Sequence, residues 1–353
     1  MRIATTLMLL FLIALGLSLA FTPMARALGI RFGAMDIPME RKIHLKPIPR
    51  IGGLVVLLSF FITFVLSVQY MPRMADLYTF NASNAIGYLG ALVVFSCGLW
   101  DDFRRLNPWT KLSFQIVAAT LAFFGGAKIS GMFFINYGIN FNIFFSYLIT
   151  VFWFVLFINA VNLIDGLDGL ACGLVFFTCL VMVILTYMHG DYLTAFYFAI
   201  LAGAVLGFLK YNFNPATIFL GDGGSYFLGY MVAIVSIRGS IKSLVGILML
   251  IPLLALGIPI FDSILSPIRR FIRGQPMFQP DKEHIHHLFL KKGFSSRNVV
   301  LLIYGITMGL CIVAIFITVF RGYGLEGISF ALLLFGMIFL VRKLGYLDYF
   351  ALD

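Results

Sequence analysis

Charged residues are scarce in this sequence of 353 residues. Asp, Glu, Lys and Arg together make up 11% of it, and 61% of the residues are hydrophobic. A typical soluble domain has about 25% charged residues, because its surface must face water. The scarcity of charge therefore excludes a soluble globular protein and predicts an all-α polytopic membrane protein, whose main solvent is lipid.

Cysteine is also rare. The chain has four cysteines, which all lie in apolar stretches and show no CxxC spacing: Cys97, Cys172, Cys179 and Cys311. We interpret them as buried hydrophobic side chains. None lies in a polar loop, which argues against a zinc site that combines cysteine with histidine.

Apolar segments long enough to cross a bilayer recur along the whole chain. A hydrocarbon core of about 30 Å takes about 20 helical residues. We predict about eleven transmembrane helices, at residues 3–24, 51–68, 84–100, 110–127, 142–158, 168–188, 192–210, 223–237, 243–263, 298–320 and 325–342. No linker of different composition divides them, so we expect residues 1–353 to form a single transmembrane domain.

The distribution of Lys and Arg predicts the orientation of these helices. If the loop at residues 25–50 is cytoplasmic, 19 of the 25 basic residues lie on the cytoplasmic side. Cytoplasmic loops carry the excess of Lys and Arg, so we predict the N-terminus outside and the C-terminus in the cytoplasm. The first segment could instead be a cleaved signal peptide ending near Ser18-Leu19-Ala20. Cleavage would reverse the basic count, so we keep this segment as a membrane span.

Acidic residues gather on the same side of the membrane. Twelve of the 15 Asp and Glu lie on the predicted cytoplasmic side. Membrane orientation does not require this bias, because acids contribute little to it. We therefore expect a functional site formed by five cytoplasmic loops, at residues 31–50, 101–109, 159–167, 211–222 and 264–297.

The loop that begins at residue 159 places amides and carboxylates at a membrane boundary. Asn159, Asn162 and Asp165 recur every three residues at the end of an apolar helix, so we expect them on one broad side of it. Polar groups at this depth are costly unless they coordinate something. Helix capping and turn formation, helped by Gly166 and Gly169, are the alternative explanation for some of these residues.

The acidic pair Asp101-Asp102 follows the third predicted span. Adjacent helical residues point about 100° apart, so the two carboxylates cannot serve one ligand identically. We expect one of them to face a metal ion while the other orients a substrate or accepts a proton.

The glycine-rich segment at residues 221–225, Gly-Asp-Gly-Gly-Ser, opens a predicted helix. Glycines at a helix N-terminus let an anion approach free N–H groups. A carboxylate there, Asp222, can hold Mg²⁺, which keeps phosphate and water as its other ligands. A tight turn is the alternative explanation of the segment alone. Phe219, just before it, could stack on a base or face lipid.

The last long loop combines an acid with histidines. Asp281 precedes His284, His286 and His287, a group that suits an anionic phosphate better than zinc. Before them we predict a short interfacial helix at residues 267–274, with proline at its first position, glycine after its end, and Arg269 on its polar side. Carboxylates bring Mg²⁺ and cations bring phosphate, so the five loops together indicate phosphoryl transfer, with a lipid as one reactant.

Five motifs stand in order along nearly the whole chain. They are DxPxxRxxHxxPxPxxGG at residues 36–53, paired aspartates at 101–102, NxxNxxDGxDG at 159–169, GDxGS at 221–225 and DxxHxHH at 281–287. Together they resemble the polyprenyl-phosphate N-acetylhexosamine-1-phosphate transferase family, in the branch that starts O-antigen, enterobacterial common antigen or teichoic-acid linkage synthesis. Residues 131–142 are similar to the short periplasmic β-hairpin of this family, with a turn at Tyr137-Gly138.

The resemblance implies a role for each matching residue. The implied ligands of Mg²⁺, for which Mn²⁺ can substitute, are Asp222 and Asn162. The implied catalytic residues are Asp101, Asp102, Asp165 and Asp168, of which Asp101 or Asp102 acts on the lipid phosphate while Asp165 and Asp168 line the uridine or sugar pocket. The implied substrate-binding residues are Lys111, Asn159, Asn212, Phe219, Arg269, Arg270, His284, His286, His287, Asp36, Arg41 and His44.

The implied reaction transfers N-acetylhexosamine-1-phosphate, above all GlcNAc-1-phosphate, from a UDP-sugar to undecaprenyl phosphate and releases UMP. The implied setting is the bacterial inner membrane, with the site facing the cytoplasm. The implied partners are these two substrates and membrane lipid. Whether the protein also forms a homodimer stays open. The net charge of +10 reflects membrane orientation, so we expect no nucleic-acid partner.

Two other functions stay open as alternatives. MurNAc-pentapeptide transferases share the implied fold, but their last loop typically carries three consecutive histidines, whereas this chain has His284-Ile285-His286-His287. A proton- or cation-coupled transporter would place its acids near the bilayer midplane. Here the acids gather at one face, and only Asp262 lies near the end of a span.

Overall fold

The structure is a computed structural model that describes residues 3–37, 47–71, 74, 77–78, 82–134, 137–242, 247–272, 274 and 284–319. The helices are α1 (Ile3–Arg31), α2 (Gly52–Tyr70), α4 (Ala82–Phe103), α5 (Pro108–Phe124), α6 (Ile143–Ile164), α7 (Leu170–Met188), α8 (Tyr192–Asn212), α9 (Gly221–Lys242), α10 (Ile247–Ala255), α11 (Gly257–Ile272), α12 (Ile285–Lys291) and α13 (Ser296–Val319). The strands are β1 (Met35–Asp36), β2 (Ile48–Pro49), β3 (Gly131–Phe134) and β4 (Tyr137–Asn140).

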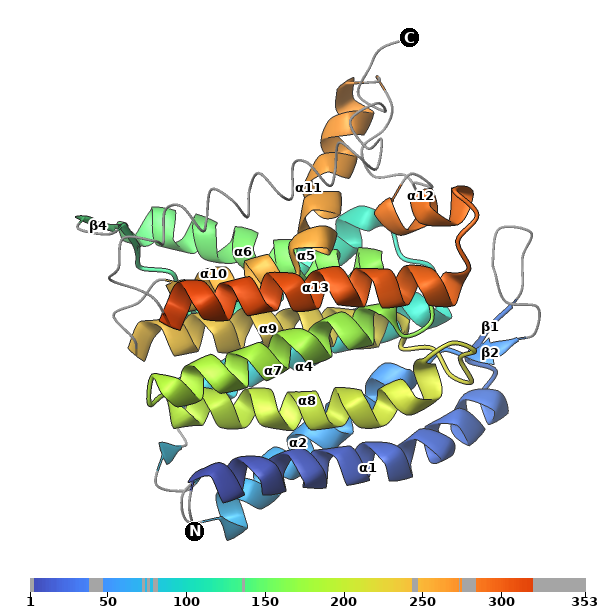
Figure 1. Cartoon of the computed structure of the whole chain (residues 1–353), viewed down its shortest axis with the longest axis horizontal. Coiled ribbons are helices and arrows are strands. Elements are labelled where there is room, and N and C mark those ends of the chain that lie inside the picture. The colour runs from blue at the N-terminus through green and yellow to red at the C-terminus, as the bar shows by residue number, and fades with distance from the viewer. Residues whose placement is uncertain are drawn as a thin grey trace.

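The long helices lie side by side along one direction (Figure 1). Within the described ranges, seven are long and apolar enough to cross a membrane: Ile3–Arg31, Gly52–Tyr70, Asn84–Phe103, Ile143–Ile164, Leu170–Met188, Tyr192–Asn212 and Ser296–Phe316. The chain is therefore a multi-pass membrane protein. The predicted span at residues 325–342 lies outside the described residues. The total of eleven spans and the sides of the two termini accordingly stay predictions.

Helix α9 lies at the centre of the bundle. It packs against α2, α4, α6, α7, α8 and α10. Between Gly223 and Gly239 all of its side chains except that of Arg238 are buried. Asp222, in the first turn of α9, therefore stands at the end of an enclosed helix, where other helix ends surround it.

Helix α1 packs closely against α8. Its buried residues recur about every fourth position: Thr6, Leu10, Ala14, Ser18, Thr22, Ala25 and Gly29. Gly203 and Gly207 of α8 face this side, and a Cβ on Gly203 would lie 2.2 Å from the carbonyl oxygen of Phe11. Small residues four apart are typical of close helix contacts in membranes. The predicted first span is thus an integral part of the helical bundle.

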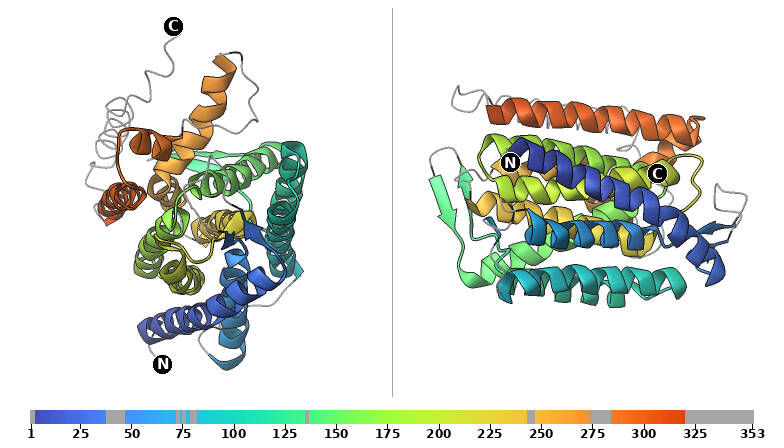
Figure 2. Two further views of the ribbon diagram at one scale, coloured as in Figure 1. Left: turned by 90° about the vertical axis from the view of Figure 1, so that its right-hand side faces the viewer. Right: turned by 90° about the horizontal axis from the view of Figure 1, so that it is seen from below.

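The predicted span at residues 243–263 is wrong as a single helix. The chain forms α10 and then α11, which projects from the bundle across the direction of the other helices (Figures 1 and 2). Pro259 has no N–H to donate to the carbonyl of Ala255, and Gly257 has a low helix propensity, so the first helix ends at Ala255. The break redirects the chain out of the bundle.

The predicted interfacial helix at residues 267–274 is part of the longer α11. Pro267 lies inside α11 rather than at its first position, because it removes only the N–H that would reach Ser263 and the helix continues. Ile268 and Phe271 are exposed, as expected for a lipid-facing side. Arg269, however, is only 1% exposed and does not lie on an open polar side.

A β-hairpin lies at the end of the bundle opposite the start of α9 (Figure 1). Strand β3 pairs antiparallel with β4, with Gly131 opposite Asn140 and Phe134 opposite Tyr137. The turn expected at Tyr137-Gly138 is wrong, because both residues belong to β4; residues 135–136 lie outside the described part. Tyrosine favours strands, which agrees with its place in the ladder. The periplasmic location of the hairpin stays a prediction.

Candidate active site

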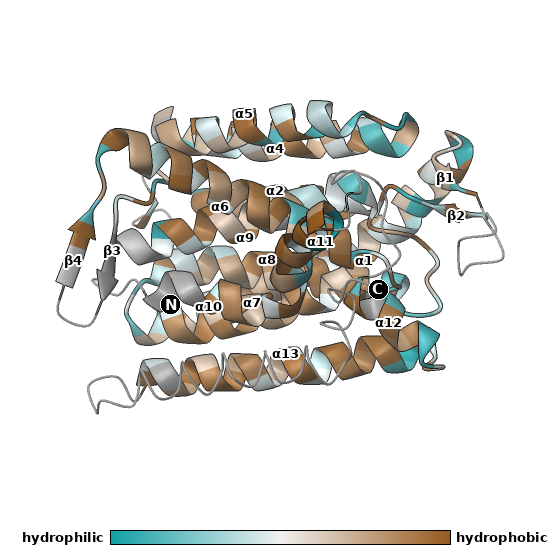
Figure 3. Ribbon diagram, turned by 90° about the horizontal axis from the view of Figure 1, so that it is seen from above, coloured by the Kyte–Doolittle hydropathy of each residue, from teal (hydrophilic) through white to brown (hydrophobic). Residues whose placement is uncertain are grey.

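The loops that carry the predicted site residues meet at one end of the bundle. Helices α1, α4, α6 and α8 end there, and α2, α5, α7, α9 and α13 begin there (Figure 1). Figure 3 shows that hydrophilic residues gather at this end, while the body of the bundle is hydrophobic. Because successive helices run in opposite directions, segments that are distant in sequence come to share one polar surface.

Two of these loops are joined by backbone hydrogen bonds. The N–H of Gly52 donates to the carbonyl of Phe219 at 2.9 Å, and the N–H of Gly53 donates to that of Leu220 at 2.7 Å. In return, the N–H of Phe219 donates to the carbonyl of Pro49 at 2.8 Å. The first N–H groups of a helix lack partners within it, so the loop before α9 satisfies the start of α2.

Glycines let α2, α4 and α9 approach closely beside this junction. A Cβ on Gly53 would lie 2.2 Å from the Cα of Gly224, and a Cβ on Gly98 would lie 2.4 Å from the carbonyl oxygen of Asp222. Neither position leaves room for a side chain. The glycines therefore fix the positions of the helix ends that carry the acids.

We expect Gly53→Ala to destabilise the protein, because the new methyl group would overlap backbone that cannot move without separating α2 from α9. Overpacking of this kind typically costs about 1–3 kcal/mol. Gly16→Ala, in α1, is the matched control, since nothing lies within 4 Å of the added Cβ. Thermal unfolding in detergent measures both variants, and equal melting temperatures for the two would contradict the proposed close contact.

Asp102 holds the start of α9. Its carboxylate accepts the N–H of Asp222 at 2.9 Å and the N–H of Gly223 at 3.1 Å. Gly221 precedes them with φ of +78°, a conformation that favours glycine. A negative charge at a helix N-terminus is stabilising. Asp102, on α4, thus orients the first turn of α9 and with it the Asp222 side chain.

Asp101 points to a different partner. Its carboxylate forms an ion pair with Lys111 of α5 and accepts the N–H of Leu106 at 2.6 Å. The two adjacent acids thus diverge, as the helical rotation predicts. Lys111 Nζ also lies 3.9 Å from Asp222 Oδ2, so Lys111 stands between Asp101 and Asp222.

Arg50 bridges two of the acids and was not predicted as a site residue. Its Nε lies 2.9 Å from Asp102 Oδ1, and its Nη2 lies 2.9 Å from Asp222 Oδ1. The neighbouring carboxylates raise the pKa of Arg50 despite its burial. The signal available in the sequence was its place two residues before Gly52 of the Gly52-Gly53 pair that meets α9.

The three polar residues of the 159–169 loop do not share one target. Asn159 forms an amide pair with Gln115 of α5, at 2.8 Å from its Nδ2 to Gln115 Oε1. Asn162 Nδ2 donates to Asp222 Oδ1 at 3.2 Å and to Ser225 Oγ at 3.0 Å. Asp165 lines a pocket. Each step of three residues turns an α-helix by about 60°, so the side chains fan out over three neighbours.

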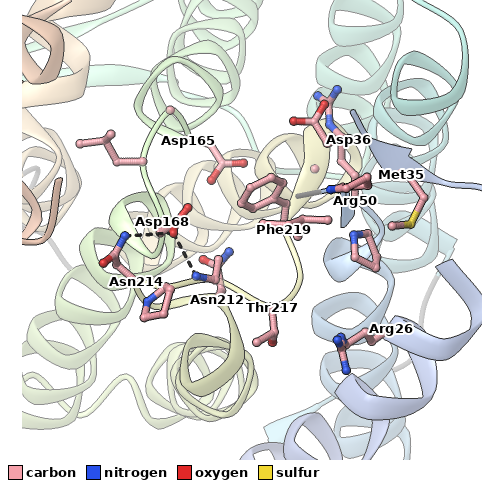
Figure 4. Close-up of a pocket in the computed structure, with 18 of the residues that line it drawn as sticks. Arg26, Met35, Asp36, Arg50, Asp165, Asp168, Asn212, Asn214, Thr217 and Phe219 are labelled. Atoms are coloured by element: carbon pink, nitrogen blue, oxygen red, sulfur yellow. Dashed lines mark hydrogen bonds between the residues drawn. The ribbon is translucent and has the colours of Figure 1, made fainter. Parts of the chain in front are cut away.

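The structure has a pocket of about 730 Å³ at this end of the bundle (Figure 4). It is lined by the predicted residues Asp36, Asp165, Asp168, Asn212, Phe219, Asp222 and His287, and by Arg26, Arg50 and Thr217, which were not predicted. Strand pairing places Asp36 opposite Ile48, which brings β1 to the rim of the pocket beside the start of α2.

Asp168 supports the wall of this pocket. Its Oδ2 accepts hydrogen bonds from Asn214 Nδ2 at 3.1 Å and from the N–H of Ala216 at 2.9 Å (Figure 4). Both donors belong to the loop between α8 and α9. Asp168 therefore holds this loop in place, and the loop forms part of the pocket wall.

Asn212 and Asp165 are polar residues that line the pocket and are costly to bury. Asn212 Nδ2 donates to the carbonyl of Ile218 at 3.1 Å, but its buried Oδ1 accepts no hydrogen bond from the described residues. Burial raises the pKa of Asp165 well above its ordinary value, and the charge of Asp222 acts in the same direction, while Arg50 opposes it. Buried polar groups without partners are costly, so this arrangement suits a bound ligand.

Comparisons with known proteins agree with the motifs. The model of glycosyl transferase family 4 matches residues 84–240. A "Probable undecaprenyl-phosphate N-acetylglucosaminyl 1-phosphate transferase" of Bacillus subtilis (strain 168) is 38% identical over 295 residues, which cover 83% of this chain and 80% of the relative. The chain belongs to the polyprenyl-phosphate N-acetylhexosamine-1-phosphate transferase family. It is therefore an enzyme, a glycosyl-1-phosphate transferase, and the predicted resemblance is confirmed.

Two further relatives have similar names. A "Decaprenyl-phosphate N-acetylglucosaminephosphotransferase" of Mycobacterium tuberculosis (strain ATCC 25618 / H37Rv) is 34% identical over 301 residues, 79% of this chain and 74% of the relative. An "Undecaprenyl-phosphate alpha-N-acetylglucosaminyl 1-phosphate transferase" of Yersinia pestis is 31% identical over 315 residues, 86% of this chain and 81% of the relative. The similarity thus extends well beyond the five motifs.

The described residues of the last loop divide between the pocket and the space between α11 and α12. His284 Nδ1 lies 3.1 Å from Asp262 Oδ2, and both side chains are buried between α11 and α12. Arg269 and Arg270 are buried as well, and neither lines the pocket, whereas His287 does. Their contact with a diphosphate stays a prediction. Three other predicted substrate-binding residues have side chains outside the described part: His286, Arg41 and His44.

The residues expected to hold Mg²⁺ fit that ion in their chemistry. Across the described residues there is no ready-made group of three His, Cys, Asp or Glu side chains. Mg²⁺ does not need one, because it is usually held through one or two carboxylates together with waters and substrate phosphates. Asp222 opens onto the pocket, and Asn162 lies beside it with its Nδ2 toward Asp222 Oδ1, so a half-turn of the amide would bring the Asn162 oxygen to the same place. This oxygen-bearing pair suits a hard divalent cation.

Proposed function

We propose that the transferase moves GlcNAc-1-phosphate from UDP-GlcNAc to undecaprenyl phosphate in a Mg²⁺-dependent reaction that releases UMP. The names of the relatives supply the sugar and the class of lipid acceptor. One observation carries the proposal for this chain. Asp101, Asp102 and Asp222 meet Arg50 and Lys111 beside a pocket, at the end of membrane-embedded helices.

The proposed reaction joins two anions. An oxygen of the lipid phosphate attacks the sugar-side phosphorus of UDP-GlcNAc, the bond from that phosphorus to the bridging oxygen breaks, and UMP leaves with the bridging oxygen. Like charges repel, so neutralisation and alignment supply most of the catalysis. A phosphate monoester has its second pKa near about 6, so the acceptor is already largely ionised and needs no strong base.

Asp222 and Asn162 would hold the Mg²⁺, which when bound supplies positive charge to the diphosphate oxygens. Asp102 keeps Asp222 in place through the first turn of α9. Lys111, now paired with Asp101, is near enough to the cluster to bind the lipid phosphate while Asp101 orients its ammonium group. Because these groups are fixed before the reactants arrive, little reorganisation is needed at the moment of reaction.

The 730 Å³ pocket is the proposed site of the uridine and sugar. Phe219 lies at the pocket wall, where its ring offers a stacking surface for the base. Asn212 lines the same pocket, and its Nδ2 donates to the carbonyl of Ile218 at 3.1 Å, which holds the loop before α9. With the base stacked on Phe219, the diphosphate of the donor would point toward Asp222 and the lipid surface. The excess of Lys and Arg in the loops at this end of the bundle supports a cytoplasmic location for it, where nucleotide sugars are made.

We expect Asp168→Ala to raise the KM for UDP-GlcNAc by roughly tenfold to a hundredfold, since the loss of hydrogen bonds to a charged group costs about 1.5–3 kcal/mol. The carboxylate holds Asn214 and Ala216, so the pocket wall loses its support. Steady-state kinetics against donor concentration measure this effect. A fall in kcat with an unchanged donor KM would instead place Asp168 among the reacting groups.

Release of UMP by the purified protein tests the proposed function. Detergent-solubilised transferase is given undecaprenyl phosphate with UDP-GlcNAc, UDP-GalNAc or UDP-MurNAc-pentapeptide, and no ion gradient. We expect UMP from UDP-GlcNAc in the presence of Mg²⁺, its loss in EDTA, and its return when Mg²⁺ is added back. Preference for UDP-MurNAc-pentapeptide would identify the peptidoglycan branch, and full activity in EDTA would remove the metal from the mechanism.

A further inference from the structure

Arg50 occupies the carboxylate that the proposed metal needs. Its Nη2 lies 2.9 Å from Asp222 Oδ1, an oxygen that also accepts a hydrogen bond from Asn162 at 3.2 Å. Its Nε lies 2.9 Å from Asp102 Oδ1. The guanidinium fork therefore neutralises two acids at once, one that orients the start of α9 and one that would bind the cation.

The surrounding charges make this contact necessary when no divalent cation is present. Asp101 is already paired with Lys111, whose Nζ is 3.9 Å from the other oxygen of Asp222. Without Arg50, Asp102 and Asp222 would face each other with no closer cation among the described residues than Lys111. Arginine cannot lose its proton in a protein, so its charge leaves the acids only if the side chain turns away.

The position of Arg50 allows such a turn. Its side chain is 31% exposed, against 4% for Asp102 and 17% for Asp222, and it lines the large pocket. The acids are fixed by helix ends, whereas Arg50 lies in the segment between β2 and α2 with a long side chain. Figure 4 shows the side chain beside Phe219 and Asp36 at the pocket.

We propose that Arg50 is a displaceable counter-ion of the metal site. It holds Asp102 and Asp222 in the metal-free enzyme, yields Asp222 to the divalent cation, and turns into the pocket to bind the phosphates of the donor. The inference rests on the proposed function, because it needs a cation at Asp222 and a phosphate-bearing donor in the pocket. Since Arg50 competes with the cation and binds the anion, the cation and the nucleotide bind cooperatively.

A purely structural clamp would have the opposite consequence. If Arg50 only kept the acids in place, its removal would disorder Asp222 and weaken cation binding. A counter-ion that competes with the cation instead strengthens cation binding when it is removed, because the acids lose their internal partner. The sign of the change in cation affinity therefore separates the two roles.

The test measures Mn²⁺ binding to purified, metal-free protein by the electron paramagnetic resonance signal of free Mn²⁺, without nucleotide. We expect Arg50→Met, which keeps an unbranched side chain without charge, to bind Mn²⁺ at least about fivefold more tightly than the wild type. Arg50→Gln is a second neutral variant, in case the first does not fold. Arg50→Lys keeps the charge and should bind Mn²⁺ within about threefold of the wild type.

A second measurement adds UMP, the phosphate-bearing product, to the same titrations, after correction for Mn²⁺ bound to UMP in solution. In the wild type we expect UMP to tighten Mn²⁺ binding, and in Arg50→Met we expect this coupling to fall toward none, by the reciprocity of linked binding. The donor KM of Arg50→Met should rise, whereas a group that only holds the acids would alter kcat.

The outcomes are distinguishable from failure of the proposed function. If the wild type binds Mn²⁺ and releases UMP from UDP-GlcNAc, but both neutral variants bind Mn²⁺ equally or more weakly while folded, the counter-ion role is overturned and the transferase function stands. If the wild type forms no UMP from any UDP-sugar, the proposed function fails and the role of Arg50 fails with it.

Discussion

Replacement of Asp222 by alanine lowers turnover by about a hundredfold to a thousandfold in the proposed mechanism. This is the range found when a preorganised electrostatic contact is removed. Asp222 is where the site converges: Asn162, Arg50 and Lys111 all approach its carboxylate, and Asp102 holds its backbone. Its loss removes the expected seat of the cation and leaves Arg50 and Lys111 without a shared partner. UMP release at saturating substrates measures the effect.

Asp191→Asn is the matched control for this experiment. Asp191 is another buried acid, but it lies at the opposite end of the bundle, where its Oδ1 accepts the N–H of Thr194 at 3.4 Å at the start of α8. Asparagine serves as well as aspartate at a helix N-terminus, so its turnover should match the wild type. Asp222→Ala that remains folded and retains more than about a tenth of the activity would contradict the proposed cation site.

Asp165→Asn should separate stability from activity. We expect activity to fall roughly tenfold to a hundredfold, because in the proposed complex the carboxyl group at the pocket wall accepts hydrogen bonds from the bound donor, and an amide accepts fewer. We expect stability of the metal-free protein to rise, because burial and the nearby charge of Asp222 raise the pKa of Asp165 above its ordinary value. An ionised carboxylate in this place opposes folding, and the neutral amide does not.

The pH dependence follows from the direction of this shift. A carboxyl group with a raised pKa binds more protons in the folded than in the unfolded state, so its contribution to stability is lost as pH rises from the ordinary value toward the raised one. Asp165→Asn has no carboxyl group at this position, so it does not lose stability in this way as the pH rises. Its melting temperature should therefore exceed that of the wild type at pH 8, with the difference shrinking as the pH approaches 4. A variant less stable than the wild type at pH 8 would show that the carboxylate has a stabilising partner.

The convergence of the site could be predicted from the sequence because its residues sit at the ends of apolar segments. Alternating membrane spans bring every second loop to the same side, so Asp102, Asn162 and Asp222 were expected together, and the structure places them in contact through the start of α9. Membrane-spanning length and hydropathy are properties of single segments, and these can be read without knowledge of packing.

The roles within the cluster depend on packing and could not be predicted in the same way. Asn159 turns to Gln115 because helical rotation carries it away from Asn162, and the pattern of every third residue hides this. Arg50 is not predictable as a site residue in this way, because a basic residue in a cytoplasmic loop is already explained by membrane orientation. Its contact with Asp102 and Asp222 becomes visible only when the loop before α2 is paired with the loop before α9.

The break between α10 and α11 could not be predicted from hydropathy either. Hydropathy over residues 243–263 is continuous, so a single span was expected, but Gly257 and Pro259 interrupt the hydrogen bonding at Ala255. The buried pair Asp262 and His284 then connects α11 to the start of α12. Local backbone chemistry overrides an apolar composition at this point.

The fate of the sugar-side phosphorus tests the central claim most directly. UDP-GlcNAc labelled with ³²P at that phosphorus is incubated with undecaprenyl phosphate, Mg²⁺ and the purified protein, and the lipid and water-soluble products are separated. Transfer of a sugar phosphate predicts that the label enters the lipid fraction in amounts equal to the UMP released. Label that stays in UDP while GlcNAc appears on the lipid would show transfer of the sugar alone and would contradict the account.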